Sequence, residues 1–279
     1  MSTELVLLGT AGGPTPKRTR SAPAQAVVVD DHVYVVDCGS GVARQLALAG
    51  LPPSALSGVF ITHHHSDHNA DYGNLFLLSW ASNLAHTVPA FGPPPLLAMT
   101  EHFFRLNAED IEIRIRDEGR PSLRDLIDPH EVTEPGEVFQ DERVTVTATL
   151  VDHPPFETAL AYRFDTPDRS IVISGDTAYS PALVKLAQGA DILVHEVLFS
   201  DALDWIVARS NGTTLRKHLV DSHTDVSEVG KVAQQAGVGM LVLSHLVPSD
   251  AGITEEQWKQ AAVADFHGDV VVGEDLMRL

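Results

Sequence analysis

A run of histidine and aspartate directly after a strand-like segment constrains this chain more than any other feature. The apolar segment 58–62 should alternate its side chains between two faces of a sheet, and residues 63–68 (HHHSDH) follow it as a loop. His63 and His65 are placed to share one metal ion, and Asp67 and His68 begin the next turn, where they can reach a second. Imidazole combined with carboxylate suits zinc, and also iron or manganese, at an open catalytic centre.

Three further polar residues each follow an apolar strand. They are His153 after 144–151, Asp176 after 170–175 and His245 after 240–244. Carboxyl ends of strands commonly gather ligand sites, although any one of these residues alone is equally typical of a turn cap. Together with the first cluster they predict a two-metal centre, and such a centre lowers the pKa of a bound water to about 7.

The order HxHxDH, His, Asp, His resembles the metallo-β-lactamase superfamily, and within it the RNase Z and arylsulfatase-like branch. The opening Leu7–Pro14 and the segment Val35–Gly41 are similar to that branch as well, so the resemblance spans nearly the whole chain. It implies an α/β fold, an αββα sandwich of two mixed β-sheets flanked by helices, in one domain over residues 1–279. It also implies a homodimer.

The resemblance assigns the metal ligands residue by residue. His63, His65 and His153 would hold one Zn²⁺, and Asp67, His68 and His245 the other, with Mn²⁺ or Fe²⁺ as alternatives. Asp176 would bridge the two ions. Classical β-lactamases have a cysteine where this chain has Asp176, so the resemblance argues against penicillin-type substrates.

Two other segments are similar to elements of this branch. Val194–Phe199 resembles its HEAT-type strand and His223-Thr224 its HST-type element, which implies that Glu196 orients His223 as the acid for the leaving group. An imidazole is a suitable acid because its pKa lies near about 6.5. The alternative is an ordinary polar pair. We expect Asp67 to orient the nucleophile, and Asp37 either to fix a ligand imidazole or to make only a structural hydrogen bond.

Composition predicts a soluble, cytoplasmic enzyme with a full core. The chain is 44% hydrophobic, and its 19 basic against 38 acidic residues give a net charge of −19. That charge repels nucleic-acid backbones and anionic lipid unless a local basic patch intervenes. A small anionic or ester substrate is therefore expected, with no nucleic acid and no membrane. The single cysteine, Cys38, excludes an internal disulfide, and no apolar stretch approaches the roughly 20 residues that span a bilayer.

The substrate is harder to predict. The resemblance implies that an RNase Z carries a long tRNA-binding arm between the third histidine and the bridging aspartate, and only 22 residues separate His153 from Asp176. We therefore expect a binuclear zinc hydrolase of small esters, most like the arylsulfatase-like members. A phosphodiesterase or a lactone or carboxylic-ester hydrolase is the alternative. RNase Z is disfavoured, and a non-enzymatic metal-binding sensor is the last alternative.

The remaining pattern predicts where helices begin and end. A helix is expected over Asp67–Leu84, strands over 144–151, 159–164 and 170–174, and a hairpin turn at 165–168. Asp225 with Glu228 should begin a helix that ends at Gly237, and Thr254 with Gln257 the last one.

The pattern of residues 86–142 predicts a helical, substrate-facing insertion, with a helix over Leu96–Leu106. Its arginines either bind an anionic substrate or, as we favour, pair with the interleaved acids; they are Arg105, Arg114, Arg116, Arg120 and Arg124. Lys17, Arg18 and Arg20 lie in a loop that either meets an anion or is merely solvated. Segment 200–221 is either a lid over the metals or a dimer contact.

Overall fold

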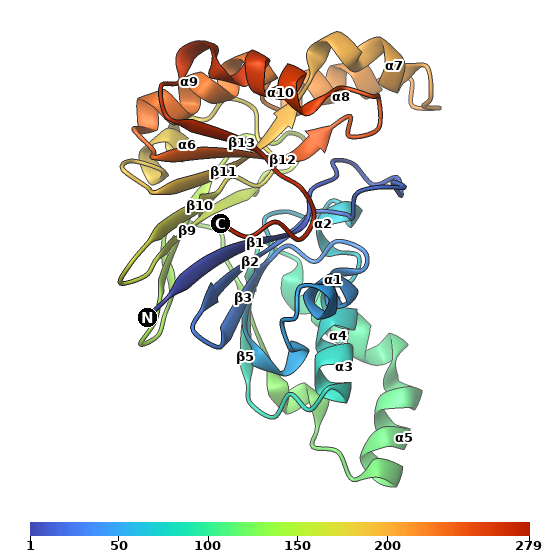
Figure 1. Ribbon diagram of the computed structural model, residues 1–279. Coiled ribbons are helices and arrows are strands. Elements are labelled where there is room, and N and C mark those ends of the chain that lie inside the picture. Colours follow the sequence, from blue (N-terminus) through green and yellow to red (C-terminus); the bar gives the residue numbers. More distant parts are fainter.

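Two β-sheets face one another in the computed structural model, which describes residues 1–279, and helices cover their outer faces (Figure 1). The first sheet has the strand order β1 (Thr3–Gly9), β2 (Ala24–Val29), β3 (His32–Val36), β4 (Leu56–Phe60), β5 (Val88–Gly92) and β6 (Ile127–Glu131). Its first three strands pair antiparallel, and β3 to β6 pair in parallel.

The second sheet repeats this plan. It contains β7 (Gly136–Gln140), β8 (Thr145–Leu150), β9 (Leu160–Asp165), β10 (Ser170–Ile173), β11 (Ile192–Leu198), β12 (Met240–Val247) and β13 (Asp269–Val272), in that spatial order. Strands β7 to β10 pair antiparallel and β10 to β13 in parallel. The carboxyl ends of parallel strands in each sheet therefore lie along one edge, where loops can gather polar side chains.

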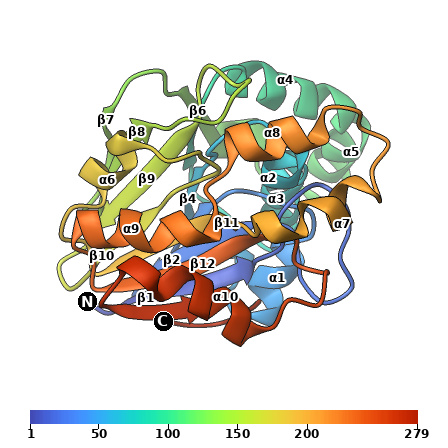
Figure 2. The same ribbon diagram turned by 90° about the horizontal axis from the view of Figure 1, so that it is seen from above.

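Helices flank both sheets, as Figure 2 shows from above. On the first sheet these are α1 (Val42–Leu48), α2 (Ser66–Asn69), α3 (Tyr72–Ala81), α4 (Leu96–Leu106) and α5 (Ala108–Glu118). The second half carries α6 (Pro181–Leu186), α7 (Leu203–Val207), α8 (Leu215–Ser222), α9 (Val226–Ala236) and α10 (Glu255–Ala262). No helix is both long enough and apolar enough to span a bilayer.

Three apolar clusters hold these layers together. One lies between the first sheet and its helices, one between the two sheets, and one between the second sheet and its helices. The middle cluster is rich in aromatic rings, and Phe60 contacts Phe91, Tyr162 and Phe164 there. The expected αββα sandwich is confirmed.

The single helix expected over Asp67–Leu84 is wrong, because the structure divides it into α2 and α3. Asp71 lies between them and makes hydrogen bonds to the loop after β3. Its backbone N–H donates to the carbonyl oxygen of Cys38 at 2.9 Å, and its carboxylate accepts from the N–H of Gly41 at 2.6 Å. These bonds tie α2 to the loop after β3 and so fix the helix turn that carries Asp67 and His68.

The helix starts later in the chain follow the sequence pattern closely. Asp225 caps α9 by accepting from the N–H of Ser227, although without the reciprocal bond from Glu228, and Gly237 ends the helix with φ 66°. Thr254 and Gln257 form the full capping box of α10. The hairpin between β9 and β10 is present as expected.

Segment 86–142 is only partly helical. Strands β5 and β6 complete the first sheet, β7 begins the second, and the helices lie between them. Arginines on this helical part pair with exposed acids: Arg114 with Asp110 and Glu118, and Arg124 with Glu101. The geometry favours a solvated face over a substrate site, because α5 extends away from the body of the molecule in Figure 1.

Candidate metal centre

Seven histidine and aspartate side chains meet between the two sheets. They come from the loop and helix after β4, the loops after β8 and β10, and strand β12. These residues are His63, His65, Asp67, His68, His153, Asp176 and His245, and all except His65 are buried. The chain thus places every metal-ligand candidate of the sequence pattern at one edge of the sandwich.

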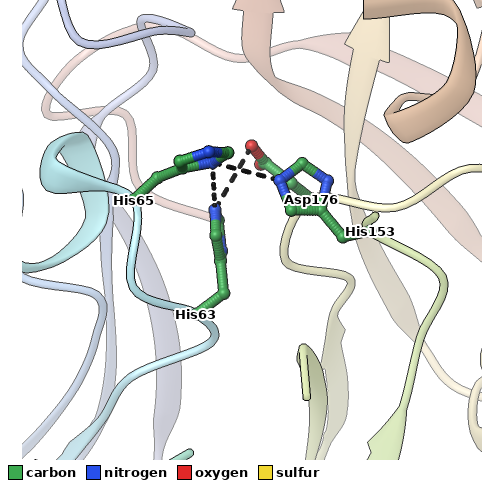
Figure 3. A group of neighbouring side chains, drawn as sticks. All are labelled: His63, His65, His153 and Asp176. Carbon is green, nitrogen blue, oxygen red and sulfur yellow. Dashed lines mark hydrogen bonds and ion pairs between the residues drawn. The ribbon is translucent and has the colours of Figure 1, made fainter. Parts of the chain in front are cut away.

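Four of these side chains form a first group, drawn in Figure 3. Nδ1 of His65 lies 3.0 Å from Nε2 of His63 and 3.1 Å from Nε2 of His153. Oδ2 of Asp176 lies 3.8 Å from Nε2 of His63. Three imidazole nitrogens and one carboxylate oxygen therefore converge within 4.8 Å of one another.

A second group of donors lies on the other side of Asp176. Oδ2 of Asp67 is 3.7 Å from Nε2 of His68 and 3.4 Å from Nε2 of His245. Oδ2 of Asp176 is 3.4 Å from the same atom of His68 and 3.3 Å from that of His245. Asp176 is therefore the one carboxylate that both groups share.

The donor set fits divalent cations. Nε2 of His68 and Oδ1 of Asp176 are buried and have no hydrogen-bond partner, which is costly unless a cation satisfies them. Burial lowers the pKa of His153 to about 4 and that of His63 well below its ordinary value. These imidazoles therefore keep the free lone pair that a metal ligand needs.

Charges compensate one another within the second group. Burial raises the pKa of the Asp67 carboxyl, but His68 and His245 outweigh it and hold the pKa at about 2. Burial likewise opposes charge on His68, whose pKa is nevertheless raised well above its usual value by Asp176, Asp37 and Asp67. Bound cations would take over this compensation.

His245 owes its position to a β-bulge, and the expectation that its strand ends at Ser244 is wrong. Strand β12 continues to Val247, and the register with β11 shifts so that His245 is an extra residue with φ 45°. A bulge redirects one side chain without ending the strand. The glycine turn after β1 packs here, since a Cβ on Gly12 would lie 3.0 Å from Nδ1 of His245.

Asp37 supports the centre from behind. Its carboxylate accepts from Nδ1 of His68 at 2.7 Å and from the backbone N–H of Thr62 at 2.8 Å. Bonding at Nδ1 leaves Nε2 of His68 facing Asp67 and Asp176. Asp37 itself has φ 62°, an unusual conformation for a residue other than glycine, and its hydrogen bonds hold it there.

His223 and Glu196 form a buried pair beside the metal ligands. Nδ1 of His223 lies 3.1 Å from Oε2 of Glu196, whose other oxygen accepts from the N–H of Thr224 at 2.7 Å. Burial opposes charge on His223, but Glu196, together with a smaller contribution from Asp176, raises its pKa to about 9. The pair, 27 residues apart in the sequence, is thus suited to donate a proton.

Three more residues lie at or near the centre and are not among the predicted ligands. His64 points away, with Nε2 2.7 Å from the carbonyl oxygen of Pro93. Phe156 places its ring 4.7 Å from that of His65, and His218 of α8 lies 5.6 Å from it. Sequence reasoning misses Phe156 because one phenylalanine after two prolines carries no ligand signal. His218 falls in the segment expected to be a lid or a dimer contact, where its own role has no local signature.

Comparison with known proteins agrees with this geometry. A Beta-lactamase superfamily domain model matches residues 32–246. The Ribonuclease Z of Mycobacterium bovis strain BCG is 35% identical over 279 residues, covering 99% of this chain and 97% of that protein. That of Mycobacterium marinum is 34% identical over 280 residues and covers 99% and 98%.

Among solved structures, human tRNase Z, short form, superposes with a TM-score of 0.72 at 20% identity and covers 99% of this chain and 98% of its own. The sequence-based preference for an arylsulfatase-like hydrolase is wrong, because the full-length relatives are named Ribonuclease Z. The chain belongs to the metallo-β-lactamase superfamily of metal-dependent hydrolases, and within it to the RNase Z branch.

Proposed function

We propose that this protein is an RNase Z-type enzyme that hydrolyses a phosphodiester bond in RNA, with tRNA precursors as the substrate class. The observation that carries the proposal is identity of 35% to a Ribonuclease Z along 99% of the chain. The site geometry supports it, since two donor groups that both approach Asp176 suit the clamping of a phosphoryl group.

The proposed ligands are those that converge in the structure. His63, His65 and His153 would hold one divalent ion and Asp67, His68 and His245 the other. Asp176, which lies in the first group and within 3.4 Å of His68 and His245, would serve both. Zinc suits this nitrogen and oxygen donor set best, with Mn²⁺ or Fe²⁺ next. When bound, the ions activate a water and polarise the phosphoryl oxygen.

The protein's own residues would then move protons and fix geometry. Asp67 accepts a hydrogen bond from the attacking water and orients it. His223, held by Glu196 at 3.1 Å, donates a proton to the departing oxygen. Asp37 fixes the ring of His68 through Nδ1.

The expectation of a small substrate and no nucleic acid is corrected by the same relatives, whose name is that of a ribonuclease. The short span between His153 and Asp176 remains a distinctive feature: it contains β9 and a tight hairpin to β10, with no projecting arm. RNA would therefore be held by side chains at the site itself.

Removal of the metal tests the proposal directly. We expect purified protein to contain about two zinc equivalents, and chelation to abolish cleavage of a precursor tRNA transcript until zinc is restored. Inductively coupled plasma mass spectrometry gives the metal content, and gel electrophoresis the cleavage. Aryl sulfate serves as the comparison substrate. Cleavage that survives complete metal removal would exclude the mechanism, and an intact transcript with the zinc-loaded enzyme would exclude the substrate.

A further inference from the structure

We propose that the rim of the metal centre is a nucleoside subsite, in which Phe156 stacks on a base and His218 accepts a hydrogen bond from the ribose 2′-hydroxyl next to the scissile phosphate. The inference rests on the proposed RNA substrate and deepens it. It gives the site a way to recognise RNA without an arm.

The position of His218 is fixed by α8. Its ring centroid lies 5.6 Å from that of His65, 6.0 Å from His153 and 6.1 Å from His223, and the side chain is half-buried. His218 thus borders both the first donor group and the proposed acid. It belongs to neither group of converging donors.

The hydrogen bonds around His218 determine which ring nitrogen is free. Oγ of Ser222 lies 2.6 Å from the carbonyl oxygen of Pro154 and donates its only hydrogen there. The same Oγ lies 3.3 Å from Nδ1 of His218 and so accepts from it. Nε2 of the neutral ring is then an acceptor, and no protein group bonds to it.

An acceptor at this place discriminates between parts of a nucleotide. Phosphate oxygens at neutral pH carry no hydrogen to donate, so Nε2 gains nothing from them. A ribose 2′-hydroxyl donates readily, and it is the group that distinguishes RNA from DNA. His218 is therefore suited to read the sugar that adjoins the reacting phosphate.

Phe156 supplies the apolar part of the subsite. It lies in the loop between β8 and β9, parallel to His153 within 10° at 5.9 Å and nearly perpendicular to His65 at 4.7 Å. The ring is half-exposed at an edge lined mainly by polar side chains. Aromatic faces at such sites stack on nucleic-acid bases irrespective of base identity.

Both residues contact the same two imidazoles, those of His65 and His153. A base and its ribose are joined to the same phosphate, so they must lie on one side of the metal centre together. The two side chains meet that requirement, although they come from segments 62 residues apart in the sequence.

The test compares three substrates with zinc-loaded wild type, His218→Ala and Phe156→Ala. They are a precursor tRNA transcript, the same transcript with 2′-deoxy sugars flanking the mapped cleavage bond, and bis(p-nitrophenyl) phosphate, which has neither ribose nor base. For wild type, the deoxy sugar should lower kcat/KM roughly threefold to tenfold, the effect of one hydrogen bond. His218→Ala should lower it similarly on RNA and abolish the further effect of the deoxy sugar.

Phe156→Ala should lower kcat/KM for RNA about tenfold or more and keep the deoxy effect. Metal content should stay within about twofold of wild type in both variants. Bis(p-nitrophenyl) phosphate hydrolysis should do so in His218→Ala, because that substrate has no ribose hydroxyl. Val220→Ala, on the exposed side of α8, is the matched control. A deoxy effect that persists in His218→Ala, or equal loss on all substrates in that variant, overturns the ribose contact. Unchanged kcat/KM for RNA in Phe156→Ala overturns the stacking, and loss of metal in either variant overturns the subsite. If wild type cleaves only the small phosphodiester, the RNA function itself fails.

Discussion

The charge of the His223 imidazole depends mainly on the carboxylate of Glu196, with a smaller contribution from Asp176. Burial alone disfavours the protonated ring, and Glu196 at 3.1 Å reverses this and raises the pKa to about 9. A raised pKa keeps the ring protonated at neutral pH and lets it lose the proton as the pH passes about 9. An acid role for His223 therefore predicts that the rate falls on the alkaline side.

Glu196→Gln tests this dependence. The amide removes the favourable charge while burial remains, so the pKa of His223 should fall and the alkaline limb of kcat should move by more than about one pH unit toward neutrality. The measurement is kcat against pH with a substrate that has a poor leaving group. His223→Ala should slow that substrate far more than bis(p-nitrophenyl) phosphate. An unchanged alkaline limb in Glu196→Gln would rule out the pair as the acid.

Among single residues, the sequence predicts those side chains whose chemistry and spacing are both distinctive. Clustered histidines after a strand indicate metal ligands by themselves, and Asp176 and His245 follow at strand ends. Phe156 carries no such signal. Its role depends on which rings lie beside it, and the ring of His65 comes from the distant loop after β4, so only the fold reveals the contact.

At the scale of single elements, the turn after β10 presents Asp176 to both donor groups. Gly175 has φ 60°, and a Cβ there would lie 2.7 Å from the carbonyl oxygen of Leu160 and 2.9 Å from Cβ of Thr62. A side chain at this position must push apart the β9 backbone and the segment that leads to His63. The turn therefore requires glycine at position 175 for two reasons, the positive φ and the lack of space for a Cβ.

Gly175→Ala should destabilise the protein by about 3 kcal/mol and weaken metal binding, because strain in the left-handed region adds to a backbone clash. Gly189→Ala is the matched control: Gly189 has φ 64° but open space where its Cβ would lie. That variant should lose only about 1 kcal/mol. Urea unfolding of both variants measures the difference, and equal losses would show that the close approach contributes nothing.

Local pattern predicts the caps of α9 and α10 because a cap involves residues three or four positions apart. It fails between α2 and α3, where Asp71 bonds to Gly41 and Cys38 across 30 and 33 residues. It also fails at His245, because a bulge is a property of two paired strands. Both features depend on partners that are distant in the sequence, so the sequence of one element alone does not predict them.

In the whole molecule, the fold could be predicted from the sequence and the substrate could not. The site lies between two similar half-structures. Strands and helices recur in both halves, and their apolar periodicity is visible in the sequence. The net charge of −19 describes the whole surface, whereas the substrate meets only one edge of it. The expectation of no nucleic acid is wrong, because the net charge of the whole protein does not determine the charge at the edge that contacts the substrate.

The charges near the site predict that kcat/KM for RNA depends only weakly on salt concentration. Near the site, Lys17 pairs with Asp250 at 3.5 Å, and Arg20 donates to the hydroxyl of Thr10 and the carbonyl oxygen of Gly273. Arg18 is the one cation of that loop whose side chain makes no bond to the protein. With few free cations, few counterions are released on RNA binding, and screening of the overall negative charge offsets their effect. Between 50 and 200 mM salt we expect kcat/KM for the transcript to fall by less than about tenfold. Arg18→Ala should flatten the slope further. A fall of about a thousandfold in wild type would contradict this prediction, because it requires about six or more phosphate contacts.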